Sequence, residues 1–342
     1  MSKTLSNEFN LFIDLGTAHT VIVVKDHGIV LNEPSIIAIQ ELGPQRHKVL
    51  AAGRQAVELV KKNPGNIYLR YPLRDGVVAD TQNTAQMLRI FFQNLPSRIR
   101  PYIPKALVVV PFEASEVERK GTLHILKAAG INKARLIDEP LVGAIGAELP
   151  IHKPQGFMVV DFGGGTVEVA VIALNDIIYC ESLKLGGHRM VDAIIDHYKN
   201  QHNLLIDREN AERIKIQYAT SIPRKNVVAF SLEGVDSRSG VPKTITTNSE
   251  ELSLILHPFF DQITQAIFRA LSQTPPELVS DIMDGQLVLI GGGALTKEIA
   301  ERITNDTQIK ARIAADPLLC MAKGGHRLLL NPEILNELSW EE

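Results

Sequence analysis

Two copies of one short pattern constrain the fold of this chain more than any other feature. In the first half, an apolar run ends in Asp14, and Gly16 and Thr17 follow closely. In the second half, an apolar run ends in Asp161, and three glycines lead to Thr166. Each copy is typical of a strand that turns back through a glycine hairpin. One copy alone also occurs in ordinary strand connections, so the duplication carries the argument.

The residue types of both copies suit phosphate binding. Glycine reaches positive φ without a Cβ clash, so successive backbone N–H groups can converge on phosphate oxygens. The aspartates at the two strand ends, Asp14 and Asp161, can hold a hydrated Mg²⁺ against the phosphates. Turn capping is their alternative role. The glycines concerned are Gly16, Gly163, Gly164 and Gly165.

The sequence after each copy excludes two better-known phosphate motifs. Residues 20–25 and 167–174 continue as β-like segments. The Walker and Rossmann fingerprints instead lead from the glycine loop directly into a helix. Two hairpins that hold one triphosphate from both sides fit the pattern better.

Composition narrows the class further. A chain of 342 residues exceeds what one hydrophobic core usually spans, so two domains are expected. The 36 basic and 39 acidic residues nearly balance, which argues against nucleic acid as a partner. Cys180 and Cys320 are too few for a disulfide framework or a zinc site. Neither a spanning helix of roughly 20 apolar residues nor a signal peptide is recognisable, so we expect a cytosolic protein.

The element pattern predicts one plan used twice. Each half begins with a β-meander, continues through an insertion and then alternates strands with helices. We therefore predict an α/β fold with two duplicated domains that face a nucleotide cleft. The predicted ranges are 1–150 with an insertion at 35–71, 151–315 with an insertion at 186–248, and 316–342 for a C-terminal helix that returns to the first domain.

The individual elements follow from hydrophobic periodicity and capping signals. Strands are expected at residues 11–14, 20–25, 28–31, 106–110, 135–137, 157–161, 167–174, 177–183, 226–232, 243–247 and 286–290. Helices are expected at residues 53–62, 81–95, 115–129, 141–148, 188–202, 208–220 and 249–273, from 296 onward, and at 317–330, where we expect the last helix to end. Thr247, Asn248 and Glu250 predict a capping box for the longest helix. Residues 1–8 are expected to be disordered.

Three motifs resemble those of the actin, Hsp70 and sugar-kinase ATPases. Residues 14–17 are similar to the phosphate-1 motif, residues 161–166 to the phosphate-2 motif, and Gly291, Gly292 and Gly293 to the adenosine motif. Within that superfamily, four further segments resemble the bacterial actin MreB family. These segments are residues 28–35, 72–77, 116–119 and 274–278. The similarity runs over residues 9–330, nearly the whole chain.

The resemblance implies an actin-like ATPase fold, with ATP and Mg²⁺ bound between the two domains. It also implies that copies of the chain assemble into double filaments on the inner face of the cell membrane. There they would position the cell-wall elongation machinery and set rod shape. The motifs themselves suit ATP and GTP equally.

Three residues are expected to act in hydrolysis, namely Glu139, Thr166 and Asp161. A water that attacks the γ-phosphate needs an acceptor to orient it and a metal ion to neutralise charge. Glu139 and Thr166 match the family's water-positioning pair. Glu139 also follows a predicted strand, at the edge where α/β sheets bind ligands. Its alternative role is a helix N-terminal carboxylate ahead of Pro140.

The resemblance implies contacts with the base and the ribose as well. Glu212 and Lys215 match the acid and the lysine that the family uses there, and their spacing places both on one helix face. An exposed salt bridge is their alternative role. The glycines at 291–293 are expected to let the backbone approach the adenosine, and a plain strand–helix turn is the alternative.

Four residues depart from typical relatives near the nucleotide. His19 replaces asparagine, Val167 threonine, Asp138 glutamate and His188 aspartate. His19 is still expected to donate a hydrogen bond to phosphate, and it could become charged near neutral pH. Val167 removes a hydroxyl beside the γ-phosphate. We therefore expect slow hydrolysis.

The family attaches to membranes through an N-terminal amphipathic helix or through an apolar loop of the first domain. Residues 1–8 hold one lysine and few apolar side chains, which makes a poor anchor. The segment from Leu95 to Lys105 combines four apolar or aromatic side chains with three cations, as an interface-seeking loop requires. Its prolines argue against a helix. An ordinary surface connection is the equal alternative.

Two other functions are compatible with such a fold. A non-polymerising, Hsp70-like ATP-dependent binding protein would couple cleft closure to a partner. It needs a substrate domain, for which the dozen or so residues after the last predicted helix leave no room. A small-molecule kinase needs a catalytic aspartate to accept a hydroxyl proton. Glu139 followed by proline resembles the ATPase branches instead.

Overall fold

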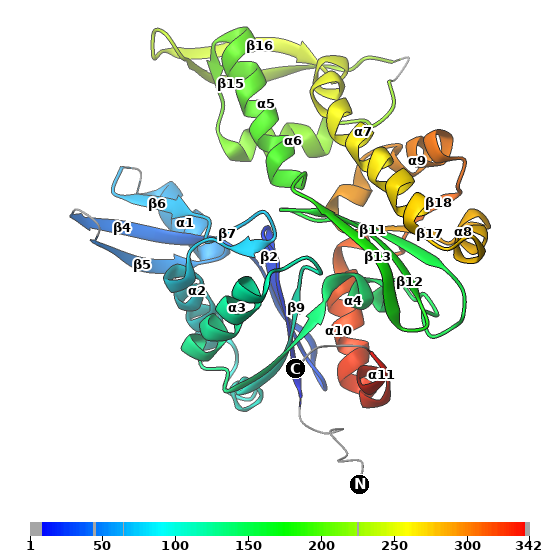
Figure 1. Ribbon diagram of the computed structural model, residues 1–342. Coiled ribbons are helices and arrows are strands. Elements are labelled where there is room, and N and C mark those ends of the chain that lie inside the picture. The colour runs from blue at the N-terminus through cyan, green and yellow to red at the C-terminus, as the bar shows by residue number, and fades with distance from the viewer. Residues whose placement is uncertain (1–8, 44–45, 64, 224–225, 339–342) are drawn as a thin grey trace.

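The computed structural model describes residues 9–43, 46–63, 65–223 and 226–338. It consists of two α/β halves, each built on a five-stranded sheet and extended by a smaller lobe (Figure 1). Helix α4 (Glu139–Gly146) contacts strands of both sheets, and helix α10 (Cys320–Leu330) packs against α4. The expected disorder of residues 1–8 concerns positions outside the described residues.

The two large sheets have the same strand order. The first runs β3-β2-β1-β9-β10, and the second runs β13-β12-β11-β17-β18. In each sheet the three meander strands are antiparallel, and the last two strands are parallel to the first meander strand. The strands are β1 (Leu11–Leu15), β2 (His19–Val24), β3 (Gly28–Pro34), β9 (Lys105–Val110) and β10 (Lys133–Asp138), and then β11 (Phe157–Phe162), β12 (Val167–Ala173), β13 (Asp176–Leu183), β17 (Leu287–Ile290) and β18 (Ala311–Ile313). This repetition confirms the predicted duplicated α/β fold.

Burial explains why the central strands are almost continuously apolar. Helices cover both faces of such sheets, so side chains on both faces must be apolar. Every residue of β12 is buried, and Glu168 is the charged exception among them. Among the described residues, one large core cluster lies in each half, a third joins the halves around α4 and α10, and a smaller fourth lies in the lobe of the first half.

The lobe of the first half lies between β3 and β9 in the chain. Its elements are β4 (Ile37–Gly43), β5 (Arg46–Ala52), α1 (Arg54–Lys62), β6 (Ile67–Arg70), β7 (Leu73–Arg74) and β8 (Val77–Val78). Helix α2 (Thr81–Asn94) follows with Asp80 as its cap. Helix α3 (Glu116–Ala129) begins with a capping box of Ser115 and Glu118 and ends at Gly130, whose φ is 109°.

The lobe of the second half is inserted between β13 and β17. Its elements are α5 (Gly187–His202), β14 (Leu204–Leu205), α6 (Arg208–Tyr218), β15 (Ala229–Asp236), β16 (Pro242–Asn248) and the start of α7 (Ser249–Gln273). The predicted capping box of α7 is wrong. The Asn248 side chain alone caps the helix, because it accepts the N–H groups of Glu250 and Glu251 at 3.0 and 2.9 Å.

Helix α7 is followed by α8 (Pro276–Met283) and α9 (Ile299–Thr307). Two helix boundaries near the C-terminus differ from expectation. Residues 292–295 form a 3₁₀ turn, so the helix expected from residue 296 begins at Ile299. A further helix, α11 (Pro332–Glu337), follows α10 because Pro332 can start a new helix but not continue the old one. The Arg135 guanidinium attaches α11 to β10 by donating to the Leu335 carbonyl at 3.0 Å.

Helix α10 packs on the first sheet. Gly325 lies against the ring of Phe12, where an added Cβ would be 2.2 Å from a ring carbon. The Arg327 guanidinium donates to the carbonyl of Ile145 on α4 at 2.7 Å. The division of the chain at residues 150 and 315 stays a prediction.

The interpretation of residues 95–105 as an apolar membrane loop is contradicted. Leu95 and Ile99 are buried in the first core, and Tyr102 and Ile103 pack against it. The apolar side chains therefore point inward and leave Arg98 and Lys105 exposed. A short 3₁₀ turn at Arg100–Tyr102 lies within this segment. Within the described ranges, no helix is both long and apolar enough to cross a membrane.

Candidate functional site

Both glycine hairpins are present and have equal length. Leu15 pairs with Thr20 across β1 and β2, so residues 16–19 form the first hairpin. Phe162 pairs with Val167 across β11 and β12, so residues 163–166 form the second hairpin. Asp14 and Asp161 therefore occupy the same place in the two sheets, one residue before the last pair.

The two hairpins lie in direct contact with each other. A Cβ added to Gly164 would lie 2.6 Å from the Cβ of Ala18. A Cβ added to Gly165 would lie 2.4 Å from the hydroxyl of Thr17. Real Cβ atoms do not approach other atoms so closely, so only glycine permits this contact.

Neighbouring segments fix both hairpins in place. The first hairpin is held by Ser35, whose N–H donates to the Ala18 carbonyl at 3.0 Å and whose hydroxyl donates to the Gly16 carbonyl at 2.6 Å. The second is held by the start of α5, where the His188 N–H donates to the Gly164 carbonyl at 2.9 Å.

One turn links the hairpins across the two halves. The Gly76 N–H donates to the Thr17 hydroxyl at 3.0 Å, and Gly76 also lies against the methyl group of Thr166. The preceding residue, Asp75, forms a 3.0 Å ion pair with Arg189 on α5. The turn thus contacts both hairpins and, through Arg189, the start of α5.

Four carboxylates gather beneath the hairpins. Asp14 and Asp161 end β1 and β11, and Glu139 is the first residue of α4. Glu168 lies on β12 directly opposite Asp161 and is 2% exposed. The sequence motifs indicate Asp14, Asp161 and Glu139 but not Glu168.

The surroundings of these carboxylates disfavour their negative charges. Loss of solvent, together with the neighbouring Asp161 charge, raises the pKa of Asp14 to about 7. Loss of solvent also raises the pKa of Asp161 to about 7. Burial first, and then the charge of Glu168, raises the pKa of Glu139 well above the usual range. Burial first, and then the charge of Asp161, raises the pKa of Glu168 to about 8. The group needs protons or a cation.

The donor atoms suit Mg²⁺. All four groups offer hard carboxylate oxygens, which magnesium prefers. One oxygen of Glu168 accepts the Phe112 N–H at 3.3 Å, whereas its buried Oε2 has no hydrogen-bond partner among the described residues. A buried carboxylate oxygen without a donor is costly unless a cation or water satisfies it.

An ion pair holds the residue that precedes α4. Asp138, at the cap position, accepts from Arg119 on α3 at 2.6 Å, so its charge is matched. Glu139 then begins the helix with Pro140 after it, which agrees with its alternative role at the helix N-terminus. That role does not exclude the other, because the same backbone position directs Glu139 toward the carboxylate group.

Lys215 and Glu212 form a 2.9 Å salt bridge on α6, as their alternative role required. The ammonium group of Lys215 also donates to the Gly187 carbonyl at 3.2 Å. The Gly187 N–H in turn donates to the Gly163 carbonyl at 3.0 Å. Lys215 is therefore two hydrogen bonds away from the second hairpin, although its role stays a prediction.

The glycines at 291–293 lie against the second hairpin strand. Gly291 has a φ of 79°, and a Cβ there would be 2.3 Å from a carboxylate oxygen of Asp161. A Cβ on Gly293 would be 2.6 Å from the side chain of Phe162. Gly292 is exposed. This run therefore packs against the strand end that carries Asp161, and its contact with adenosine stays a prediction beside the alternative of a plain turn.

The surroundings of His19 disfavour the expected charging of its ring near neutral pH. Loss of solvent around the ring, followed by the positive charge of Arg54, lowers the pKa of His19 although part of the residue stays exposed. A neutral imidazole can still donate one hydrogen bond. Burial likewise lowers the pKa of His188 to about 4.

Two sequence signals could have identified the missed residues. Glu168 interrupts an apolar strand, and a charged residue at a buried strand position usually serves a site. Asp75 and Gly76 form a turn of the type that tolerates positive φ, with φ values of 48° and 81°. The sequence did not indicate that this turn would reach Thr17 in another part of the chain.

The duplicated sheets, the facing hairpins and the carboxylates beneath them define a protein of the actin-like class. A family model described as MreB/Mbl protein matches residues 8–337. The chain is 42% identical over 323 residues to the cell shape-determining protein MreB of Escherichia coli K12, which covers 94% of this chain and 93% of that protein. The chain belongs to the MreB/Mbl family.

Solved structures give the same result. The crystal structure of MreB 5 of Spiroplasma citri bound to AMPPNP matches with a TM-score of 0.87 and 30% identity, over 97% of this chain and 99% of that one. A MamK double helical filament matches with a TM-score of 0.74 at 20% identity, over 93% and 98% of the chains, which shows the shared fold.

Proposed function

We propose that this protein is a cell-shape-determining bacterial actin that binds an adenine nucleotide with Mg²⁺ and assembles into filaments. Its relative from Escherichia coli is named a cell shape-determining protein, and its structural neighbour from Spiroplasma citri binds AMPPNP. One observation carries the nucleotide assignment. Two glycine hairpins touch each other directly above four carboxylates that form no ion pair with a basic side chain among the described residues, and a metal–triphosphate would satisfy both features.

The residues divide into three groups. The backbone groups of the two hairpins, with Thr17 and His19, would bind the phosphates. Asp14 and Asp161 would hold Mg²⁺ through water, and the ion would neutralise charge on the phosphates. Glu212, Lys215 and the glycines at 291–293 would contact the ribose and base. The nucleotide would thereby join segments from both halves of the molecule.

Hydrolysis would depend on Glu139 and Thr166. Glu139 would accept a hydrogen bond from the attacking water, while the Thr166 hydroxyl would fix the water's position. Glu168 would favour the protonated form of Glu139, because its charge raises the pKa of that carboxyl group. Val167 is buried and offers no hydroxyl, so turnover would be slow.

A charge-only substitution tests this assignment. In Glu139→Gln we expect ATP binding to be retained and phosphate release to fall by about 100-fold, the usual effect of losing a positioned acid–base group. The control is Glu148→Gln, which removes a carboxylate just beyond the same helix and should leave the rate unchanged. Equal rates in wild type and Glu139→Gln would contradict the catalytic role.

Assembly and location form the second part of the proposal. The protein would form homopolymeric double filaments, as the MamK neighbour's double helical filament supports. It would lie peripherally on the inner face of the membrane and guide the cell-wall elongation machinery. Co-sedimentation with anionic liposomes tests the location. Tight ATP binding without filaments or liposome binding would favour a monomeric, Hsp70-like regulator.

A further inference from the structure

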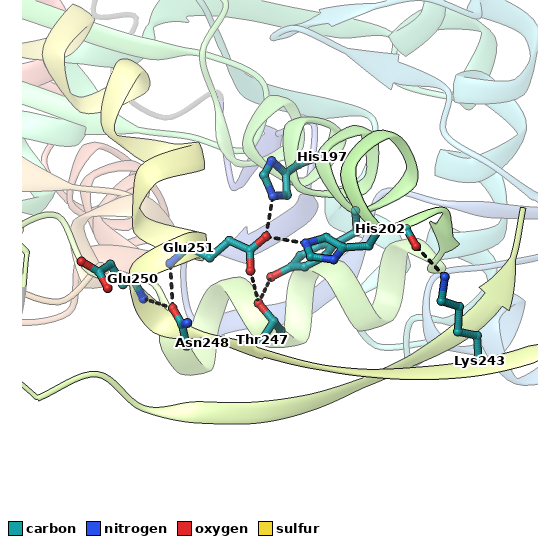
Figure 2. Close-up of polar contacts among 8 residues, drawn as sticks. His197, His202, Lys243, Thr247, Asn248, Glu250 and Glu251 are labelled. Carbon is teal, nitrogen blue, oxygen red and sulfur yellow. Dashed lines mark hydrogen bonds and ion pairs between the residues drawn. The ribbon is translucent and has the colours of Figure 1, made fainter.

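Three side chains with metal-ligand chemistry converge far from the hairpins. His197 and His202 lie on α5, and Glu251 lies in the first turn of α7. The Nε2 atoms of His197 and His202 are 2.8 and 2.6 Å from the same oxygen of Glu251 (Figure 2). The three donor atoms all lie within 4.8 Å of one another.

Only the two histidines are seen to bond Oε1 of Glu251 among the described residues, because the other neighbours bond elsewhere. Asn248 caps α7, so the Glu251 side chain is not needed for capping. The Thr247 hydroxyl donates to the other carboxylate oxygen at 2.7 Å, and Tyr198 bonds that hydroxyl at 3.0 Å. Such outer contacts orient the ligands of metal sites and are part of their design. They leave Glu251 as a one-oxygen ligand.

The location also permits entry of an ion. The three side chains are 27%, 32% and 25% exposed, so they are accessible but supported. The ammonium group of Lys243 donates to the His202 carbonyl (Figure 2) and also to Asp236, so its charge is matched away from the cluster. Without a metal, the three groups form a plain hydrogen-bond network.

We propose that His197, His202 and Glu251 bind a divalent transition-metal ion of the Zn²⁺ type, with water as the fourth ligand. Two imidazoles and one carboxylate are the ligand set of open tetrahedral zinc sites, whereas Mg²⁺ prefers oxygen ligands only. Zinc–ligand bonds of about 2.0–2.2 Å place tetrahedral donors about 3.3 Å apart. The imidazoles therefore withdraw by roughly half an ångström on binding, toward their exposed side.

The ion would join the end of α5 to the start of α7. Helix α5 begins beside the second hairpin, and His197 and His202 follow Gly187 by 10 and 15 residues, so at about 1.5 Å per residue they lie roughly 15 and 22 Å along the helix from that end. This site is therefore separate from the nucleotide site. Metal binding here needs neither nucleotide nor Mg²⁺.

Calorimetric titration with Zn²⁺, in excess Mg²⁺ to occupy the other carboxylates and without nucleotide, tests the proposal. We expect one Zn²⁺ per chain, and visible absorption typical of tetrahedral coordination when Co²⁺ replaces it. His197→Gln, His202→Gln and Glu251→Gln should each weaken Zn²⁺ binding by about 100-fold. Exposed His152 gives the matched control, and His152→Gln should bind as wild type does.

A readout on the wild-type chain guards against variants that fail to fold. In nitrogen–proton NMR spectra of the 10 histidine rings, Zn²⁺ should shift the signals of His197 and His202 before any others. Circular dichroism and ATP binding check the folding of each variant. The proposal is overturned by a wild-type chain that does not bind Zn²⁺, by unchanged affinity in a folded His197→Gln variant, or by first shifts on other histidines.

Discussion

The two glycine hairpins occupy equivalent places in sheets of the same strand order, yet different residues fill them. Thr17, Ala18 and His19 of the first hairpin correspond to Gly164, Gly165 and Thr166 of the second. Where the hairpins meet, the first keeps its side chains and the second has none. The two hairpins can therefore lie in close contact because the second has glycine, at Gly164 and Gly165, where it meets the side chains of the first.

The strands behind the hairpins differ in the same one-sided way. Val21 faces Asp14 across β1 and β2, whereas Glu168 faces Asp161 at the equivalent place in the second sheet. Both residues are buried. The second half therefore supplies an acid where the first supplies packing, and the site is asymmetric although the fold is duplicated.

The largest expected effect comes from filling the second hairpin. Gly165→Ala places a Cβ 2.4 Å from the Gly76 nitrogen and the Thr17 hydroxyl, so neighbouring backbone must move. We expect a loss of about 3 kcal/mol in the free energy of unfolding, at the upper end for overpacking. ATP affinity should fall with it. Urea unfolding and ATP titration measure both.

The equivalent position in the first hairpin provides the control. Ala18→Gly removes a Cβ that the second hairpin already accommodates, so it should cost less than about 1 kcal/mol, mostly through backbone entropy. Equal losses of unfolding free energy in Gly165→Ala and Ala18→Gly would show that the two hairpins tolerate side chains equally, which would contradict the proposed difference between them.

Low pH should destabilise the packing of His188, which holds the second hairpin, more than that of Ser35, which holds the first. His188 packs edge-on against Tyr71 of the other half, with the ring centroids 6.1 Å apart, whereas Ser35 holds the first hairpin and does not titrate. The folded pKa of His188, about 4, lies below the usual 6.5, so folding favours the neutral ring. The corresponding stability is present above pH 6.5 and is lost as pH falls toward 4.

We expect His188→Asn to flatten the pH dependence of unfolding between pH 6.5 and 4 by roughly 1–2 kcal/mol, reduced from the full shift because the residue is half-exposed. Thermal unfolding across that window measures the effect. His124→Asn, on the exposed face of α3, is the control and should keep the wild-type slope. An equally steep slope in His188→Asn would reject this account.

Removal of the extra acid should stabilise the empty protein. In EDTA and without nucleotide, Glu168→Gln should raise the free energy of unfolding by about 1 kcal/mol, because it removes a buried charge whose Oε2 has no hydrogen-bond partner among the described residues. Added Mg-ATP should stabilise this variant less than wild type. Both quantities come from urea unfolding at pH 8.

A glutamate on the neighbouring strand should respond in the opposite direction. Glu181 on β13 forms a 2.7 Å ion pair with Arg269, so Glu181→Gln should lose about 0.5 kcal/mol. If Glu168→Gln also destabilises the empty protein, Glu168 is a structural group and its place beside the proposed metal ion is wrong.

The smallest expected effect concerns the turn that joins the hairpins. Asp75→Asn keeps the positive φ that asparagine tolerates but removes the ion pair with Arg189, which is half-exposed. We expect a loss of about 0.5 kcal/mol and a slight fall in ATP affinity. A double-mutant cycle with Arg189→Gln measures the coupling, and a coupling near zero would show that the pair does not hold the turn.

Much of the fold follows from the sequence because its signals are local. The long helix at 249–273 was predicted with the observed bounds, since its apolar period and its asparagine cap lie within one segment. Strand β18 was missed, because three residues, two of them exposed, carry no periodic signal. Helix α11 was missed because its packing depends on Arg135, about 200 residues earlier.

Site residues could be predicted from the sequence only where they belong to a short, recognisable motif. Asp14, Asp161 and Glu139 converge as the motifs indicated. For residues 95–105, composition alone could not distinguish a membrane-binding loop from a core segment. The apolar side chains of this segment pack into the core of the first half. The charge state of His19 depends on Arg54 and on loss of solvent, neither of which its neighbours in the chain reveal.

The central claim is that Mg-nucleotide, bound between the unlike hairpins, drives assembly. High-speed sedimentation of the purified protein with Mg-ATP, with ATP and EDTA, and without nucleotide tests it most directly, with phosphate release measured in the same tubes. We predict a pellet only with Mg-ATP, accompanied by slow phosphate release. Tight ATP binding with the protein still in the supernatant, or a pellet that forms equally in EDTA, would contradict the claim.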